Sequence, residues 1–210
     1  YFPTAHLERA ILRLERYEEI RRDACGHHRD TGEHGSALRT EIENELKLVQ
    51  GHTRERREVM LAAGILALAD GHDDDAARQL AEYAKSTVTD PDGWTWAGRA
   101  WLKLHGKEAE AVAAFGEALK FRPREVLALR LRAEARLRQG EWGGALEDVE
   151  AALRAKSNDP SLLRLRGIIR EKRGDTVGAL ADYDASLKSA ESPESYLHRG
   201  HARLATGHPS

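Results

Sequence analysis

Hydrophobic residues recur at three- and four-residue spacing along most of the chain, which is the periodicity of an amphipathic α-helix. The periodic stretches are short, and a glycine separates the two members of each pair. These glycines follow one another at steps of 35, 34, 34 and 33 residues: Gly71, Gly106, Gly140, Gly174 and Gly207. A fixed period of this length indicates one supersecondary unit used repeatedly. The pattern therefore predicts an all-α protein built from repeated helix pairs.

The predicted helices alternate between a first and a second member of each pair. First helices are expected at 58–70, 92–105, 126–139, 160–173 and 194–206, and second helices at 74–86, 107–120, 141–154 and 175–189. A proline costs little at the start of a helix, because the first-turn N–H has no helical partner. Four of the six prolines stand at such junctions: Pro91, Pro123, Pro160 and Pro193. Asp90 and Asp159 precede two of them and are suited to cap the following helix.

The most complete copy of the repeat combines small and aromatic residues at fixed spacing: Trp94, Ala97, Gly98, Trp101, Ala111, Phe115, Ala118 and Pro123. This copy resembles the tetratricopeptide-repeat (TPR) motif, W-x2-L-G-x2-Y followed by A-x3-F and P. Weaker copies keep the small residues, and the resemblance covers residues 57–207. It implies a right-handed superhelical solenoid of antiparallel helix pairs. We expect about four pairs, the last unit having only a first helix, which either caps the array or interrupts a longer one.

Residues 1–56 precede the array and are expected to form an amphipathic helical hairpin. Apolar residues recur at helical spacing in 1–22 and again in 37–49, with a polar loop between them. The TPR resemblance implies that the first helix of each pair lines a concave groove. In the unit that begins at Arg57, the residues implied to face it are all apolar: Leu61, Ile65, Leu68 and Ala69. Because a large apolar face is rarely left open to water, we expect the hairpin to cover it, with a hydrophobic-ligand groove as the alternative.

Composition excludes some classes of protein. The 210 residues are 40% hydrophobic and 32% charged, which is too apolar for a disordered chain, and the formal net charge is only −2. No apolar run approaches the roughly 20 residues that a membrane-spanning helix needs. The single cysteine, Cys25, excludes an internal disulfide and fits a reducing compartment, which favours the cytoplasm.

The distribution of charge adds a candidate site. The predicted first helix 126–139 holds four arginines and one glutamate, and 160–173 holds five cations and one glutamate, whereas the second helices 141–154 and 175–189 carry mostly aspartate and glutamate. The TPR register implies that several cations, with one indole and one imidazole, face the groove: Trp96, Arg99, Lys103, Arg130, Arg138, Arg164, Lys172 and His201. Guanidinium groups suit capture of carboxylate or phosphate.

We therefore hypothesise a groove for an acidic or phosphorylated protein segment. The alternative is that the basic first helices pair with acidic second helices of the neighbouring repeat. Carboxylate-clamp co-chaperones of this family need Asn on successive first helices, and the predicted first helices here contain none. RNA recognition through the basic groove is disfavoured, because single-strand binding uses several aromatic stacking platforms and only Trp96 is suitably placed. Self-association through the edges of the array is a further possibility.

Other chemistry has little support. Cys25, His27, His28 and His34 share one loop, but their spacing matches no standard zinc knuckle, so we expect a solvated loop, no metal site and no cofactor. The chain contains no phosphate-binding glycine loop, nucleophile elbow or H-E-x-x-H motif. The sequence thus predicts a non-catalytic scaffold or adaptor with protein partners, or alternatively a regulatory segment of a larger signalling or secretion protein.

Overall fold

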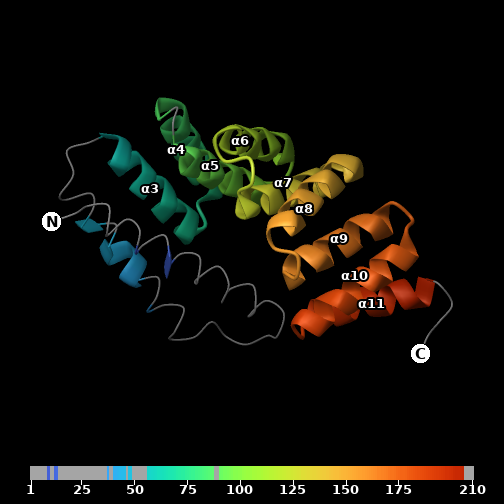
Figure 1. The fold of residues 1–210 in the computed structure, drawn as a ribbon. Coiled ribbons are helices and arrows are strands. Elements are labelled where there is room, and N and C mark those ends of the chain that lie inside the picture. The colour runs from blue at the N-terminus through green and yellow to red at the C-terminus, as the bar shows by residue number, and fades with distance from the viewer. Residues whose placement is uncertain are drawn as a thin grey trace. The chain divides into compact units, whose positions relative to one another are not determined.

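The structure is a computed structural model that describes residues 9, 12–13, 37, 40–45, 47–48, 56–87 and 90–205. From residue 56 onward these form a succession of helices joined by short turns (Figure 1): α3 (Arg56–Asp70), α4 (Asp73–Ser86), α5 (Pro91–Lys103), α6 (Glu108–Phe121), α7 (Val126–Gln139), α8 (Trp142–Ala155), α9 (Pro160–Lys172), α10 (Thr176–Ser189) and α11 (Pro193–Ala205). The predicted all-helical fold of stacked antiparallel pairs is confirmed. None of the described helices is long and apolar enough to cross a membrane.

The helix ends follow from the residues that stand there. Pro91, Pro160 and Pro193 are the first residues of α5, α9 and α11. Asp90 accepts a hydrogen bond from the Asp92 N–H at 3.0 Å, and Asp159 accepts from the N–H groups two and three residues ahead, at 3.0 and 3.1 Å. Both predicted N-caps are therefore present.

The turn inside each helix pair depends on glycine. Gly71, Gly106, Gly140 and Gly174 all have φ between 74° and 82°. Glycine adopts this left-handed conformation without the steric cost that a Cβ brings. The 34-residue recurrence of glycine in the sequence is thus the recurrence of one backbone turn.

The chain divides into two compact units, residues 1–104 and 105–210. In the first unit, α4 packs against both α3 and α5. In the second unit, each helix from α7 to α11 packs on the helix before it, and first helices α7, α9 and α11 also touch one another in succession. The second unit has a continuous core of aliphatic side chains and alanines contributed by α6 to α9.

Only part of the predicted N-terminal hairpin lies within the described residues. Those around Arg13 and Glu41 are helical, and Arg13 donates to Glu41 at 2.8 Å and to Glu45 at 3.1 Å. Arg9, one turn earlier, also pairs with Glu45 at 3.5 Å. Most of residues 1–55, including the loop with Cys25, His27, His28 and His34, lies outside the described residues, so the domain boundary at residue 56 stays a prediction.

The apolar face of α3 is covered rather than open. Leu61 is 6% exposed, and Ile65 and Leu68 are fully buried. The burial argues against an open hydrophobic-ligand groove at this place. The described contacts of α3 are with α4 and α5, so cover by the hairpin stays a prediction.

Candidate functional site

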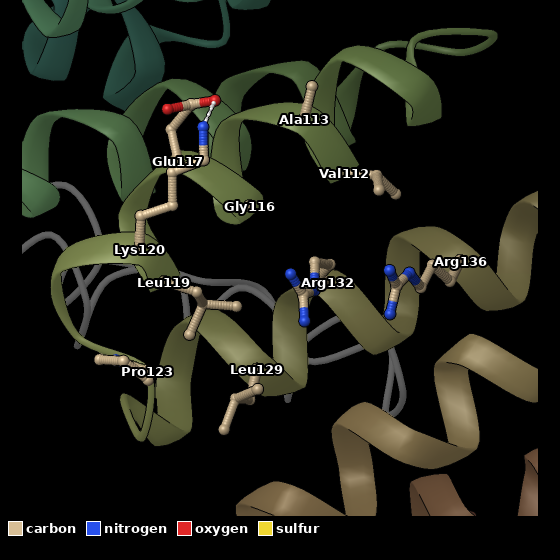
Figure 2. Close-up of a pocket in the computed structure, with 10 residues that line it drawn as sticks. All are labelled: Val112, Ala113, Gly116, Glu117, Leu119, Lys120, Pro123, Leu129, Arg132 and Arg136. Carbon is tan, nitrogen blue, oxygen red and sulfur yellow. Dashed lines mark hydrogen bonds and ion pairs between the residues drawn. The ribbon is translucent and has the colours of Figure 1, made fainter.

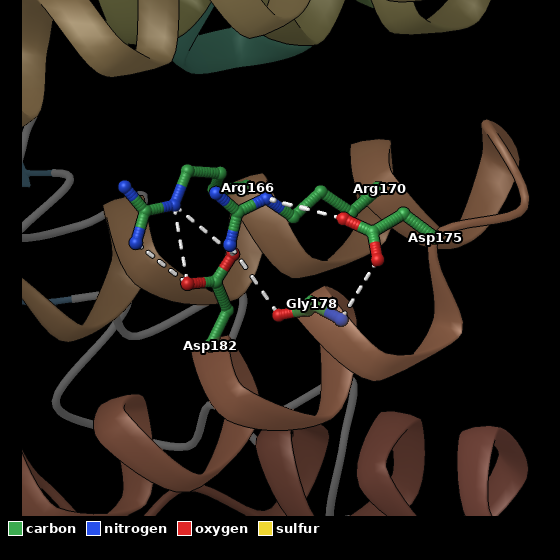
Figure 3. Close-up of polar contacts among 5 residues, drawn as sticks. All are labelled: Arg166, Arg170, Asp175, Gly178 and Asp182. Carbon is green, nitrogen blue, oxygen red and sulfur yellow. Dashed lines mark hydrogen bonds and ion pairs between the residues drawn. The ribbon is translucent and has the colours of Figure 1, made fainter.

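Two arginines of α9 hold one buried carboxylate of α10 (Figure 3). Arg166 donates from Nη2 to Asp182 Oδ1 at 2.6 Å and from Nε to Asp182 Oδ2 at 3.0 Å, and Arg170 donates from Nη1 to Oδ2 at 2.8 Å. Arg170 also reaches the Gly178 carbonyl at 3.4 Å. Asp182 is 2% exposed. The hydrogen bond to this carboxylate raises the pKa of Arg166 above its ordinary value, against the opposing effect of burial.

The same arrangement occurs 34 residues earlier. Arg132 and Arg136 of α7 donate to Asp148 of α8 at distances from 2.5 to 2.8 Å, and Arg136 reaches the Gly144 carbonyl at 3.1 Å. Asp148 is 3% exposed. Each Arg–Asp–Arg cluster joins the two helices of one pair. Sequence reasoning offered pairing with the neighbouring repeat; the described pairing is within the repeat, because these arginines lie on the side of the first helix that meets its own second helix.

The arginines that were predicted to face the groove make weaker pairs. Arg130 donates to Glu134, one turn away on α7, at 2.5 Å. Arg164 donates to Glu194 at 3.0 Å and to the Ser192 hydroxyl at 3.2 Å. The hydrogen bond from Ser192, more than the nearby Arg164, lowers the pKa of Glu194. Both ion pairs are partly open to solvent, with Arg130 22% and Arg164 29% exposed. Such pairs contribute about 0–1 kcal/mol, so a ligand carboxylate can replace the resident one.

Arg138 and Lys172 are exposed in the last turns of α7 and α9. They lie 34 residues apart, in equivalent places on first helices that touch each other. Lys103 is exposed at the equivalent place on α5, in the first unit. Beyond Lys172, α11 exposes His201 together with Leu197 (57% exposed) and Leu204 (66% exposed).

Trp96 does not offer the surface that sequence reasoning expected. Its side chain is 4% exposed, and the guanidinium carbon of Arg99 lies 4.1 Å from its ring centroid. Because an indole also serves as a core residue, helical register alone could not separate the two roles. With Trp96 buried, the aromatic residue on which RNA stacking depended is not available.

The second unit also has an open hollow of about 600 Å³ between α6 and α7 (Figure 2). The small side chains of Ala113 and Gly116 make room for it, and Arg132 and Arg136 form part of its wall. Both arginines are already held by Asp148, so a ligand in the hollow would have to compete with a buried carboxylate for them. Within the described part of the chain, no three His, Cys, Asp or Glu side chains are placed to hold a metal.

Sequence reasoning missed Asp148 and Asp182, the buried partners of the arginine pairs. A signal was present, because both aspartates lie 16 residues after an arginine, Arg132 or Arg166, and 34 residues from each other. They were counted among the acidic residues of the second helices, which periodicity alone assigns to solvent.

Comparison with known proteins agrees with this architecture. A family model described as tetratricopeptide repeat matches residues 61–126, 105–160 and 130–196, which together span more than half of the chain. The chain belongs to the tetratricopeptide-repeat family. TPR proteins generally mediate protein–protein interactions, and the TPR scaffold is typically non-catalytic. No curated protein matches the chain.

Solved TPR structures share the fold at low sequence identity. MamA from Desulfovibrio magneticus RS-1, residues 41 to the end, has a TM-score of 0.69 at 21% identity over 74% of this chain and 88% of that one. A thermophilic TPR protein of Thermus thermophilus has a TM-score of 0.65 at 16% identity over 81% and 93%. In the APC/C hetero-tetramer Cut9–Hcn1 the values are 0.66 and 17%, over 83% of this chain and 40% of that one.

Proposed function

We propose that this TPR protein is a non-catalytic scaffold or adaptor that binds an acidic or phosphorylated segment of a partner protein. The binding surface is the first-helix face of the second unit, made of Arg130, Arg138, Arg164, Lys172, Leu197 and His201. The observation that carries the proposal is the exposure of Arg138 and Lys172 at equivalent places on touching helices. The arginines turned toward the second helices are already neutralised by buried aspartates.

The cations of the second unit fall into two groups that differ in what a ligand has to displace. Arg132 and Arg166 each hold an aspartate that is almost inaccessible to water, and opening such a pair leaves a buried carboxylate uncompensated. Arg130 and Arg164 hold glutamates that are 30% and 57% exposed. Replacing those glutamates with a ligand carboxylate exchanges one solvated ion pair for another and costs little.

The same face also predicts the apolar part of the ligand. Leu197 is 57% exposed on α11, which touches α9 and so continues the line from Arg138 and Lys172. Apolar area buried by a ligand contributes about 25 cal/mol per Å² before the costs of binding. We therefore expect the partner segment to combine acidic or phosphorylated residues with an aliphatic side chain toward one end.

The experiment is a selection from a displayed library of random peptides, using the full chain as bait. A binding-face variant, Arg138→Glu with Lys172→Glu, is compared with a matched control, Arg154→Glu with Lys188→Glu. Arg154 and Lys188 are also exposed and also 34 residues apart, but lie on second helices α8 and α10. Both variants change the net charge equally.

Wild type and the control are expected to enrich peptides rich in Asp and Glu, and the binding-face variant is expected to lose them. Retention of the same peptides by the binding-face variant, with its helical circular dichroism unchanged, contradicts the proposal. Selection of basic or purely apolar peptides by wild type also contradicts it.

A further inference from the structure

Helix α11 repeats the arginine pair of the two first helices before it. Arg199 lies 33 residues after Arg166, and Arg203 lies 33 residues after Arg170. One helical turn separates Arg199 from Arg203, as in α7 and α9. In α7 and α9 the pair faces the second helix of its own unit and holds an aspartate there.

The four helix pairs between α3 and α10 show what such an arginine pair goes with. Arginine stands at both places in α7 and α9, and the facing second helices carry Asp148 and Asp182. The two earlier pairs have neither arginine nor acid at these places. The corresponding residues are Ala63, Ala67 and Gln79 in one, and Ala97, Trp101 and Ala114 in the other. Within these four pairs, the arginine pair and the facing aspartate therefore occur together or not at all.

The side of α11 that carries these arginines is open. Tyr196 is 47% exposed, whereas Leu129 and Leu163, its equivalents in α7 and α9, are 3% and 6% exposed. A Cβ added at Gly200 meets nothing within 4 Å, whereas one added at Gly167 lies 2.5 Å from the Tyr183 ring. Tyr196 and Gly200 thus occupy helix-contact positions against which no described helix packs.

The opposite side of α11 is already packed. Ser195 and Ala202 are fully buried, and the His198 ring stacks on Tyr183 with the centroids 5.7 Å apart. Arg199 donates to Asp184 at 2.9 Å, but Asp184 is 45% exposed, so this is a solvated pair of the kind that a buried carboxylate can displace. α11 therefore docks on the array by one face and presents a second face to solvent.

We propose that this second face of α11, formed by Tyr196, Arg199, Gly200 and Arg203, binds an amphipathic helix of a partner protein as α9 binds α10. An aspartate of the partner helix is held between Arg199 and Arg203. The pattern of the partner helix follows from the two helices that fill this role here. A small residue stands three positions before the aspartate, an apolar residue directly after it and a small residue four positions after it: Ala145, Asp148, Val149 and Ala152 in α8, and Ala179, Asp182, Tyr183 and Ser186 in α10.

The occupant is a partner protein and not an intact second copy of this chain. The two helices of the described chain that carry the pattern, α8 and α10, are already packed on their own arginines. A second copy would have to open one of these pairs before it could donate a helix. The inference is independent of the proposed function, because the acidic segment proposed above lies on a different side of the first helices.

The test uses the α10 sequence itself, Thr176–Ser189, as a labelled peptide added to the full chain, with binding followed by fluorescence anisotropy. Saturable binding is expected, and the peptide with Asp182→Asn is expected to bind at least roughly ten-fold more weakly, the loss of about one charge-assisted contact. The chain variant Gly200→Leu is expected to block binding while α11 stays folded, because the added side chain enters open space. Arg138→Glu with Lys172→Glu is expected to bind this peptide as wild type does.

A free peptide of this length is a marginal helix. The same sequence is therefore also joined to the C-terminal end of the chain by a flexible Gly/Ser linker, and hydrogen exchange of the α11 amides is measured. Stronger protection of α11 is expected from the fused α10 sequence and not from its Asp182→Asn form. Equal protection by both fusions, or binding that survives Gly200→Leu, overturns the inference. Concentration-dependent dimers of the unfused chain that Gly200→Leu abolishes would overturn it in favour of a second copy.

Discussion

Replacing Asp182 with alanine tests whether the arginine clusters hold the helix pairs together. Asp182 accepts hydrogen bonds from both Arg166 and Arg170 and is 2% exposed. Truncation removes one buried negative charge and leaves two guanidinium groups facing each other between α9 and α10. Breaking a buried ion pair by removing one partner costs about 3–5 kcal/mol.

The expected loss here is smaller, because the two arginine side chains are 23% and 25% exposed and water can solvate them after the substitution. We therefore expect Asp182→Ala to lower the free energy of unfolding by roughly 2–3 kcal/mol. Asp182→Asn keeps one acceptor and the shape of the side chain, and should cost about half as much.

The assay is urea unfolding followed by far-UV circular dichroism, with Asp184→Ala as the matched control. Asp184 lies two residues away on the same helix and pairs with Arg199, but it is 45% exposed. Its truncation should cost about 0–1 kcal/mol. Equal losses for Asp182→Ala and Asp184→Ala would refute the reasoning, since burial is the difference between the two carboxylates.

Three further predictions concern packing, pH and capping. Gly167→Ala should destabilise by about 1–2 kcal/mol, because its Cβ would lie 2.5 Å from the buried Tyr183 ring, whereas Gly200→Ala should stabilise by about 0.5–1 kcal/mol; thermal unfolding compares the two. Burial lowers the pKa of His198 from 6.5, so the unfolded chain binds the proton more readily. Stability from neutral His198 is complete above pH 6.5 and is lost as pH falls through the folded pKa. Hydrogen exchange of α11 between about pH 7.5 and 5.5 should show this loss, and His198→Leu should remove it. Asp159→Ala should cost about 1 kcal/mol by uncapping α9, and urea unfolding that shows no change would contradict the cap.

The charges around His198 fix the sign of that pH prediction. Burial is the largest cause of the lowered pKa, and the nearby cations Arg164 and His201 act in the same direction. Glu171 and Glu194 oppose it. A rise in α11 protection on acidification would mean that the two glutamates dominate over burial.

The helices could be predicted from the sequence because their ends depend on single residues. A glycine with positive φ ends the first helix of each described pair or follows it directly, and a proline starts α5, α9 and α11. Such residues have strong local preferences that tertiary contacts rarely override. The fold class followed from the period of these residues, and the family model agrees with it.

The candidate site could be predicted only in part, because arginines on two sides of one helix look alike in sequence. Arg130 and Arg132 are two residues apart, yet one pairs with a partly exposed glutamate of its own helix and the other with a buried aspartate of the next. Which role each arginine takes depends on whether its carboxylate partner is buried. Trp96 failed for the same reason, since register gives the direction of a side chain and not what covers it.

The central claim is that the first-helix face recognises an acidic segment through Arg138 and Lys172. The most direct measurement is the affinity, by isothermal titration calorimetry, of one acidic peptide selected by wild type for wild type, for Arg138→Glu with Lys172→Glu, and for the control Arg154→Glu with Lys188→Glu. Reversing two exposed cations removes two ion pairs and adds repulsion, about 1–3 kcal/mol in total. The account predicts at least roughly ten-fold weaker binding for the binding-face variant and little change for the control. Equal weakening of both variants, or of neither, would contradict it.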